Sequence, residues 1–146
     1  MDILSIGIVL FIVLETLNIF MLYFTPDTRR GNGIGVFNAY EKSQEDPDVQ
    51  ALVKYLINWV AGTKLIFIGL LIIILIMGNS TIRVFSVIAL IFSILTFFWR
   101  LYPAIRKMDK TDQITPKGYS KTLGIMIGGF IAMFAVTLIF YLMFFR

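Results

Sequence analysis

Four long apolar stretches constrain this chain more than any other feature of its sequence. They cover Ile3–Phe24, about Ile57–Met77, about Ile82–Tyr102 and about Thr122–Phe145. A helix needs about 20 mostly apolar residues to cross the hydrocarbon of a bilayer, and each stretch has that length. We therefore predict an all-α, polytopic membrane protein: a bundle of four transmembrane helices that forms one domain over residues 1–146.

The composition agrees with this class and excludes several kinds of chemistry. Charged residues make up 15% of the chain, against roughly 25% in soluble domains. The sequence has no Cys and no His, which excludes disulfides, thiol redox chemistry, bis-His haem and the usual zinc sites. The commonest general base is absent too. We predict no catalytic residue, no metal site and no cofactor, and the balance favours a protein that is not an enzyme.

The distribution of Lys and Arg predicts how the spans are oriented. The two long connections, about residues 25–56 and 103–121, carry ten of these residues when Arg100 at the end of the third span is included. The opposite side carries two, Arg83 and Arg146. Because basic residues concentrate in cytoplasmic loops, we expect both connections inside and both termini outside. This bias accounts for the net charge of +4 without a nucleic-acid partner, and we expect a bacterial inner membrane protein.

Residues typical of helix ends support these boundaries. Residues 46–48, Asp-Pro-Asp, favour a helix that starts near Pro47, several turns before the second span. Thr-Pro at 115–116 is a similar start signal for the fourth span. Gly-Asn-Ser-Thr at 78–81 predicts a tight turn. Pro103 is expected to end or kink the third helix.

Two opposite charges lie deep in adjacent spans. Glu15 follows Ile3 by twelve residues, which places it about 18 Å into the first span. Lys64 precedes Gly78 by fourteen residues, about 21 Å from the same edge. Since an unpaired charge in hydrocarbon is costly, we predict an ion pair that joins the first two spans. The alternatives are that Glu15 titrates to carry a proton or bind a cation, and that the pair faces a ligand.

Other polar and small residues are candidates for packing or binding. Asn18 follows Glu15 by three residues on the same helix face, and we expect it to hydrogen-bond between helices. Asn18, Lys54 and Asn58 are also ligand-binding candidates. A stripe of small residues in the fourth span predicts close helix packing, which we expect within the chain; a dimer or trimer seam is the alternative. The stripe consists of Gly124, Gly128 and Ala132.

Basic and glycine-rich segments lie in the connections. Four cations near the end of the third span are candidates for binding lipid phosphates, or they simply set the topology. They are Arg100, Arg106, Lys107 and Lys110. The segment 29–35, Arg-Arg-Gly-Asn-Gly-Ile-Gly, has no Walker motif, and we expect a flexible turn beside the membrane.

The layout and one short segment are similar to the membrane-associated eicosanoid and glutathione metabolism family. The segment runs from residue 46 to Ala61. In that family a basic residue, an Asn four residues later and a Glu three residues after that help to bind glutathione. Lys54 replaces the usual Arg, Asn58 matches, and Ala61 stands where Glu is expected. The resemblance implies a membrane transferase, or a non-catalytic relative, that binds glutathione or a lipid-like ligand between protomers.

We interpret the chain first as a small, non-catalytic membrane binding module that contacts membrane lipids or a membrane protein partner. The first alternative is a transferase like the family just named, with glutathione or a lipid as its ligand. The second is a small proton- or cation-coupled transporter that uses Glu15, which requires a carboxylate with a raised pKa.

Overall fold

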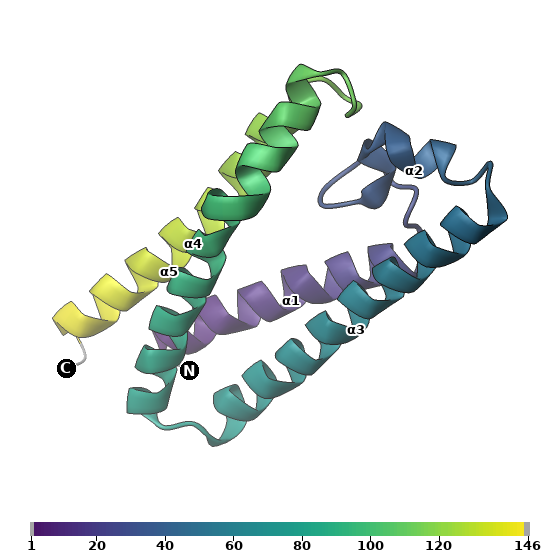
Figure 1. Cartoon of the computed structure of the whole chain (residues 1–146). Coiled ribbons are helices and arrows are strands. Elements are labelled where there is room, and N and C mark those ends of the chain that lie inside the picture. The colour runs from purple at the N-terminus through teal and green to yellow at the C-terminus, as the bar shows by residue number, and fades with distance from the viewer. Residues whose placement is uncertain (1, 145–146) are drawn as a thin grey trace.

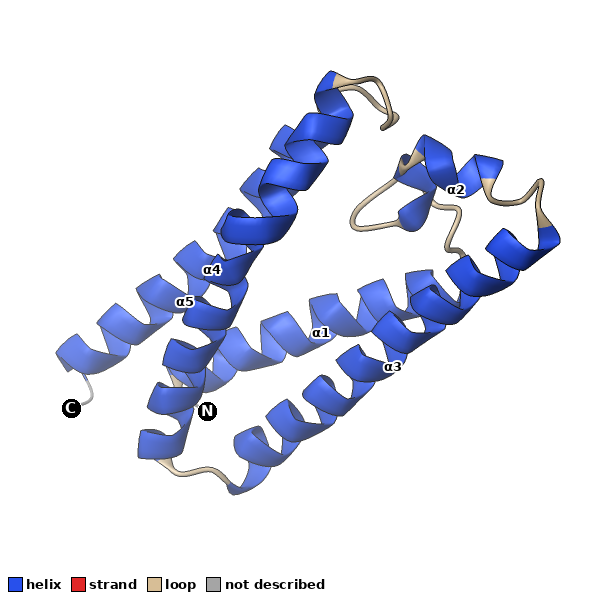
Figure 2. Ribbon diagram, in the orientation of Figure 1, coloured by secondary structure: helices blue, strands red, loops and turns tan. Residues whose placement is uncertain are grey.

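The computed structural model describes residues 2–144, and Figures 1 and 2 show that long helices dominate it. Four of these helices are long and apolar enough to cross a membrane, which confirms the predicted class. They are α1 (Ile3–Phe24), α3 (Pro47–Met77), α4 (Ser80–Lys110) and α5 (Tyr119–Phe144). Two short elements, η1 (Ile34–Val36) and α2 (Asn38–Lys42), lie between α1 and α3. Phe145 and Arg146, counted above in the fourth span and on the outer side, lie outside the described residues.

The four long helices form two antiparallel pairs. α1 packs along α3, and α4 packs along α5 (Figure 1). α1 also contacts α4 and α5, so it joins the two pairs. We call the end with Asp2, the α3–α4 turn and Phe144 the turn end. The opposite end, with residues 25–46 and 111–118, is the connection end (Figure 2).

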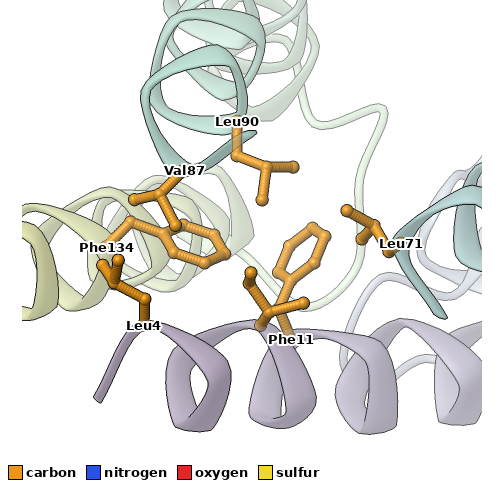
Figure 3. Packing of buried hydrophobic residues seen from close by; sticks show 7 residues of the cluster. Leu4, Phe11, Leu71, Val87, Leu90 and Phe134 are labelled. Carbon is orange, nitrogen blue, oxygen red and sulfur yellow. The ribbon is translucent and has the colours of Figure 1, made fainter. Parts of the chain in front are cut away.

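The core at the turn end explains why α1 is central. Phe11 of α1 packs edge-on against Phe130 of α5, with ring centroids 5.2 Å apart, and also contacts Phe134. Leu71 of α3 completes the same cluster (Figure 3). The cluster consists of Leu4, Ile8, Phe11, Leu71, Val87, Leu90 and Phe134. All four long helices therefore bury side chains against one another near the first half of α1.

Side chains cap the first turns of three of the helices. The Asp46 carboxylate accepts hydrogen bonds from the N–H groups of Asp48 and Val49, at 2.9 and 3.2 Å, and α3 begins at Pro47 as predicted. Asn79 caps α4 through the Ile82 N–H. Asp2 caps α1 in the same way. Each cap satisfies a backbone donor that the first turn of a helix leaves free.

Two helix ends lie at other residues than expected, and for Pro103 the expectation of a kink rather than an end still stands. Pro103 does not end the third helix, because α4 continues to Lys110. An interior proline costs about 3 kcal/mol, but the residues beyond it bury Ile105 and place Asp109 in contact with α5. The fourth helix begins at Tyr119 rather than at residues 115–116.

The two connections fold against each other at the connection end. Phe37 and Ile114 form an isolated antiparallel bridge, flanked by a hydrogen bond from the Thr115 N–H to the Val36 oxygen at 2.8 Å. The segment 29–35 forms the expected turn. Its Gly35 N–H donates to the Pro26 oxygen at 2.9 Å. A Cβ at Gly35 would lie 1.8 Å from the Asp27 oxygen, so only glycine fits there.

The small-residue stripe of α5 is divided between two environments. A Cβ added at Gly124 would lie 2.8 Å from the Tyr102 ring, so Gly124 lets α5 approach α4 closely. The expected contact within the chain is seen at Gly124, whereas a Cβ at Gly128 would meet open space and Ala132 is exposed.

Candidate functional site

A three-residue polar cluster joins α1 to α3. Lys64 Nζ donates hydrogen bonds to Glu15 Oε2 at 2.7 Å and to Asn18 Oδ1 at 2.5 Å. Asn18 Nδ2 in turn donates to the Asn32 oxygen at 3.4 Å. The rise of the two antiparallel helices brings Glu15 and Lys64 to one level, as predicted, and the i, i+3 spacing adds Asn18.

The Glu15–Lys64 pair is mostly enclosed by protein. The exposed fractions of the two side chains are 18% and 24%. In this low-dielectric setting each charge compensates the other, and removing one would leave the other without a partner. The pair can therefore hold α1 to α3, and it leaves no net charge at this depth.

Glu15 also lines a cavity of about 410 Å³ between α1, the Gly31–Asn32 turn and α5. Glu15, Asn18 and Asn32 contribute its polar wall, while the rest is apolar and includes three methionines. Lys64 does not line this cavity; it faces a separate depression on α3 together with Trp59 and Phe67. We call the cavity that Glu15 lines the α1–α5 cavity.

A second cavity, of about 450 Å³, lies at the connection end between α1, the residues of α2 and after it, and α3. The candidates Lys54 and Asn58 both line it, whereas Asn18 does not. Tyr40 contributes its hydroxyl-bearing ring to the same wall. Burial, with the nearby Asp27 carboxylate, raises the pKa of Tyr40 above its ordinary value, so Tyr40 is a neutral hydrogen-bond donor near pH 7. Together, Lys54, Asn58 and Tyr40 and the apolar residues of this cavity suit a ligand that carries both an anionic and an apolar part.

Ala61 does not reach this second cavity. It is fully buried, with an exposed fraction of 0%, and packs in a cluster with Ile19, Leu22 and Ile57. At this position the family described above has Glu. A carboxylate here would be buried among apolar side chains of α1, so the third position of the glutathione-binding pattern is used for helix packing.

Three of the four basic candidates come together at the end of α4. Arg106, Lys107 and Lys110 line a depression of about 490 Å³ with Tyr102, Pro103 and Thr111. We call this the basic depression. Arg100 lies apart, with its guanidinium 5.3 Å from the ring of Trp99. Within residues 2–144, none of these four cations forms an ion pair with a carboxylate.

Two polar contacts that hold the helices together were not predicted from the sequence. Asp109 of α4 accepts hydrogen bonds from the N–H groups of Gly118 and Ser120, at 2.9 and 3.0 Å, and from the Ser120 hydroxyl. It therefore caps α5 from another helix. Asp2 pairs with Arg83 at 2.9 Å and so joins the start of α1 to α4. Asp109 had only one sequence signal, a carboxylate close to a Gly and a Ser that precede a long apolar run.

Asp2 also has a shifted pKa. Burial acts to raise the pKa of Asp2, but hydrogen bonds from the Ser5 N–H and hydroxyl, together with the Arg83 guanidinium, outweigh burial. The net pKa lies below the ordinary value for Asp. The carboxylate is therefore charged over the whole physiological range of pH.

The described residues contain no cluster of side chains typical of a catalytic metal centre. Within residues 2–144, no three carboxylates lie close enough together to hold a metal ion. Comparisons of the chain with protein-family models, with curated proteins and with solved structures found no match.

Proposed function

We propose that this chain is a small, non-catalytic membrane binding protein that holds anionic membrane lipids at its connection end. The observation that carries the proposal is the basic depression. Arg106 and Lys110 are one helical turn apart on one face of α4, and Lys107 lies between them. Within the described residues, none of these three side chains forms an ion pair with a carboxylate.

The chemistry of these side chains suits a lipid phosphate. A guanidinium offers paired N–H donors that match the oxygens of a phosphate, and lysines add compact charges beside it. Cations near a membrane surface attract anionic lipids by about 1 kcal/mol per charge. Three such charges around one depression favour an anionic headgroup over a zwitterionic one.

The neighbouring aromatic residues suit the headgroup level of a bilayer. Trp99 lies within two turns of the basic depression and has an exposed fraction of 74%. Tyr102 lines the depression itself. Trp and Tyr concentrate where hydrocarbon meets headgroups, and further along α4 the exposed side chains of Phe92 and Leu95 would contact acyl chains.

Thermal unfolding with and without added lipid tests this proposal directly. The protein in a neutral detergent is heated with and without an anionic phosphatidylglycerol, and with a zwitterionic phosphatidylcholine as the comparison. A lipid at a hundred times its Kd stabilises the native state by about 2.7 kcal/mol, so phosphatidylglycerol should raise Tm by several degrees.

Two charge-matched variants identify the site. Arg106→Gln/Lys107→Gln/Lys110→Gln should lose most of the Tm increase and its dependence on salt. The control is Arg30→Gln/Lys42→Gln/Lys117→Gln, which removes the same charge from elsewhere at the connection end and should keep the increase. Equal Tm increases in both variants, or an equal effect of phosphatidylcholine, would refute the proposal.

Location and assembly belong to the same proposal. The Lys and Arg bias supports the bacterial inner membrane, with the connection end in the cytoplasm and both termini outside. The open face around Gly128 and Ala132 supports a contact with a second copy, as a dimer or trimer, or with a membrane protein partner.

A second candidate function rests on the cavity that Lys54 and Asn58 share. We infer that an amphipathic anion could bind there, and glutathione is the form that the family resemblance implies. Buried Ala61 supplies no carboxylate for the ligand, which favours a lipid-like anion over glutathione. Glutathione at millimolar concentration should leave Tm unchanged if this preference is right, because a ligand that binds the native state must stabilise it.

The geometry gives less support to a proton-coupled transporter. That function needs a carboxylate that gains and loses a proton, and thus one whose charged form is not strongly favoured. Here Lys64 Nζ lies 2.7 Å from Glu15 Oε2, so this carboxylate is engaged in an ion pair that joins α1 to α3. Proton release on addition of a substrate would revive this alternative.

A further inference from the structure

The α1–α5 cavity is separate from the basic depression and is not needed for the function proposed above. It lies at the level of Glu15, within the span of α1, and its walls are α1, α5 and the Gly31–Asn32 turn. Two of these walls are helices long and apolar enough to cross a membrane. A ligand for this cavity would therefore come from the bilayer.

Gly129 of α5 leaves part of the cavity open. It lines the cavity, and a Cβ added there would meet open space. A glycine inside a helix costs about 1 kcal/mol relative to alanine. The open space beside Gly129 is therefore the part of the cavity that a larger residue would fill.

Glu15 provides an unused hydrogen-bond acceptor on the cavity wall. Its Oε2 accepts from Lys64, whereas Oε1 accepts no hydrogen bond from any residue of the described chain. An ionised carboxylate has room for about four donors. A donor from a ligand in the cavity would satisfy this oxygen.

The charges around the cavity select the head group of the ligand. Lys64 does not line the cavity, so an anionic head would meet a carboxylate of the same charge. An ammonium head would leave a net positive charge at this depth, because Lys64 already neutralises Glu15. A neutral hydroxyl donates a hydrogen bond and adds no charge.

The apolar wall suits a flexible chain. Met21, Met126 and Met133 line it together with Phe130. Thioether side chains are unbranched and adapt to irregular apolar surfaces, and sulfur packs well against aromatic rings. This wall can therefore accommodate a saturated or an unsaturated hydrocarbon tail, and the tail does not need one fixed shape.

We propose that the α1–α5 cavity binds a neutral lipid with a free hydroxyl, such as a long-chain alcohol or a monoacylglycerol. The hydroxyl donates to Glu15 Oε1, and the tail lies along the methionines towards α5. The site differs from the basic depression in both place and chemistry, since its ligand carries no charge.

Photolabelling in vesicles of phosphatidylcholine tests the site. The probe is a long-chain alcohol that carries a diazirine in its tail, and the labelled peptides are identified by mass spectrometry. We expect saturable labelling of the α5 segment that contains Met126 and Met133. Unlabelled hexadecanol should compete at least about fivefold better than hexadecane, which lacks the hydrogen bond.

Two adjacent glycines provide a matched pair of variants. Gly129→Leu fills the cavity and should reduce labelling about tenfold. Gly128→Leu makes the same change in helix propensity and volume at a position that also has open space but does not line the cavity, and it should label like the original chain. Thermal unfolding of both variants separates loss of binding from loss of folding.

Three outcomes would overturn the proposal. They are equal labelling of the two glycine variants, equal competition by hexadecane, and stronger competition by hexadecylamine or palmitic acid than by hexadecanol. The competition arms use the unmodified chain, so they decide the question even if Gly129→Leu fails to fold. None of these results bears on phosphatidylglycerol binding at the basic depression.

Discussion

The Glu15–Lys64 pair permits a quantitative test of how the first two long helices are held together. We consider Glu15→Gln, Lys64→Met and the double variant. Gln retains the shape and an acceptor oxygen, and Met retains most of the apolar stem of Lys. Each single change leaves one uncompensated charge, whereas the double change leaves none.

The magnitude follows from the enclosure and geometry of the pair. Breaking a fully buried pair costs about 3 to 5 kcal/mol. Here the two side chains are 18% and 24% exposed, and Lys64 keeps its hydrogen bond to Asn18 when Glu15 is replaced. We therefore expect each single variant to lose about 2 kcal/mol of unfolding free energy, below the range for a fully buried pair.

The double variant should lose about 2 kcal/mol in total rather than about 4, because neither charge remains to be compensated. Thermal unfolding is followed by circular dichroism in a neutral detergent. For a chain of this size, 1 kcal/mol corresponds to a Tm change of about 4 °C. The two single variants and the double variant should thus show similar decreases in Tm.

Additive losses would refute the reasoning. If the double variant lost the sum of the two single losses, the charges would not compensate each other in the native bundle. Asn18→Ala is the control, because it removes one hydrogen bond of Lys64 and leaves the ion pair intact. It should cost about 1 kcal/mol and leave the coupling between Glu15 and Lys64 in place.

Three further predictions concern contacts at the two ends of the bundle, all measured as changes in unfolding free energy. Asp109→Ala removes the cap of α5 and should cost about 2 kcal/mol, whereas exposed Asp112→Asn should cost less than about 0.5 kcal/mol; equal losses would contradict the capping role. Gly35→Ala places a Cβ 1.8 Å from the Asp27 oxygen and should cost at least about 2 kcal/mol, whereas Gly69→Ala, which meets open space, should be neutral or stabilising. Because folding lowers the pKa of Asp2 below 3.8, its contribution should be complete above that pH and lost as the pH falls through the folded value; a stability difference between the original chain and Asp2→Asn that persisted in strong acid would contradict this.

Local patterns account for most of the bundle. The bounds of α1 and the start of α3 follow from apolar length and from the Asp-Pro-Asp signal, both of which act within a few residues. The depth of Glu15 and Lys64 follows from a constant helical rise, so their pairing could be predicted from two positions alone. Such features need no knowledge of how the other helices pack.

Contacts between distant segments could not be predicted in the same way. The bridge of Phe37 with Ile114 joins two irregular connections that show no alternating pattern. Asp109 caps α5 only because α4 continues beyond Pro103, which packing rather than local propensity decides. These features depend on tertiary structure that a single sequence does not display.

Helix rotation explains why two sets of candidate residues were only partly brought together. Arg100 precedes Arg106 by about 1.7 turns, so it projects from a different side of α4. In α5, each step of four residues rotates the position by about 40°. Gly128 and Ala132 therefore move away from the face on which Gly124 contacts Tyr102, and the stripe divides between an internal contact and an open face.

Glu15 links stability to binding in a way that can be separated by experiment. Its Oε2 accepts from Lys64 and holds α1 to α3, and the Glu15 side chain also lines the α1–α5 cavity. Lys64→Met should therefore mainly lower the free energy of unfolding. Gly129→Leu should lower the binding of a hydroxyl-bearing lipid with little change in the free energy of unfolding. If both variants lost binding and stability in proportion, the cavity would form only as a consequence of the ion pair, and its ligand would act as part of the helix packing.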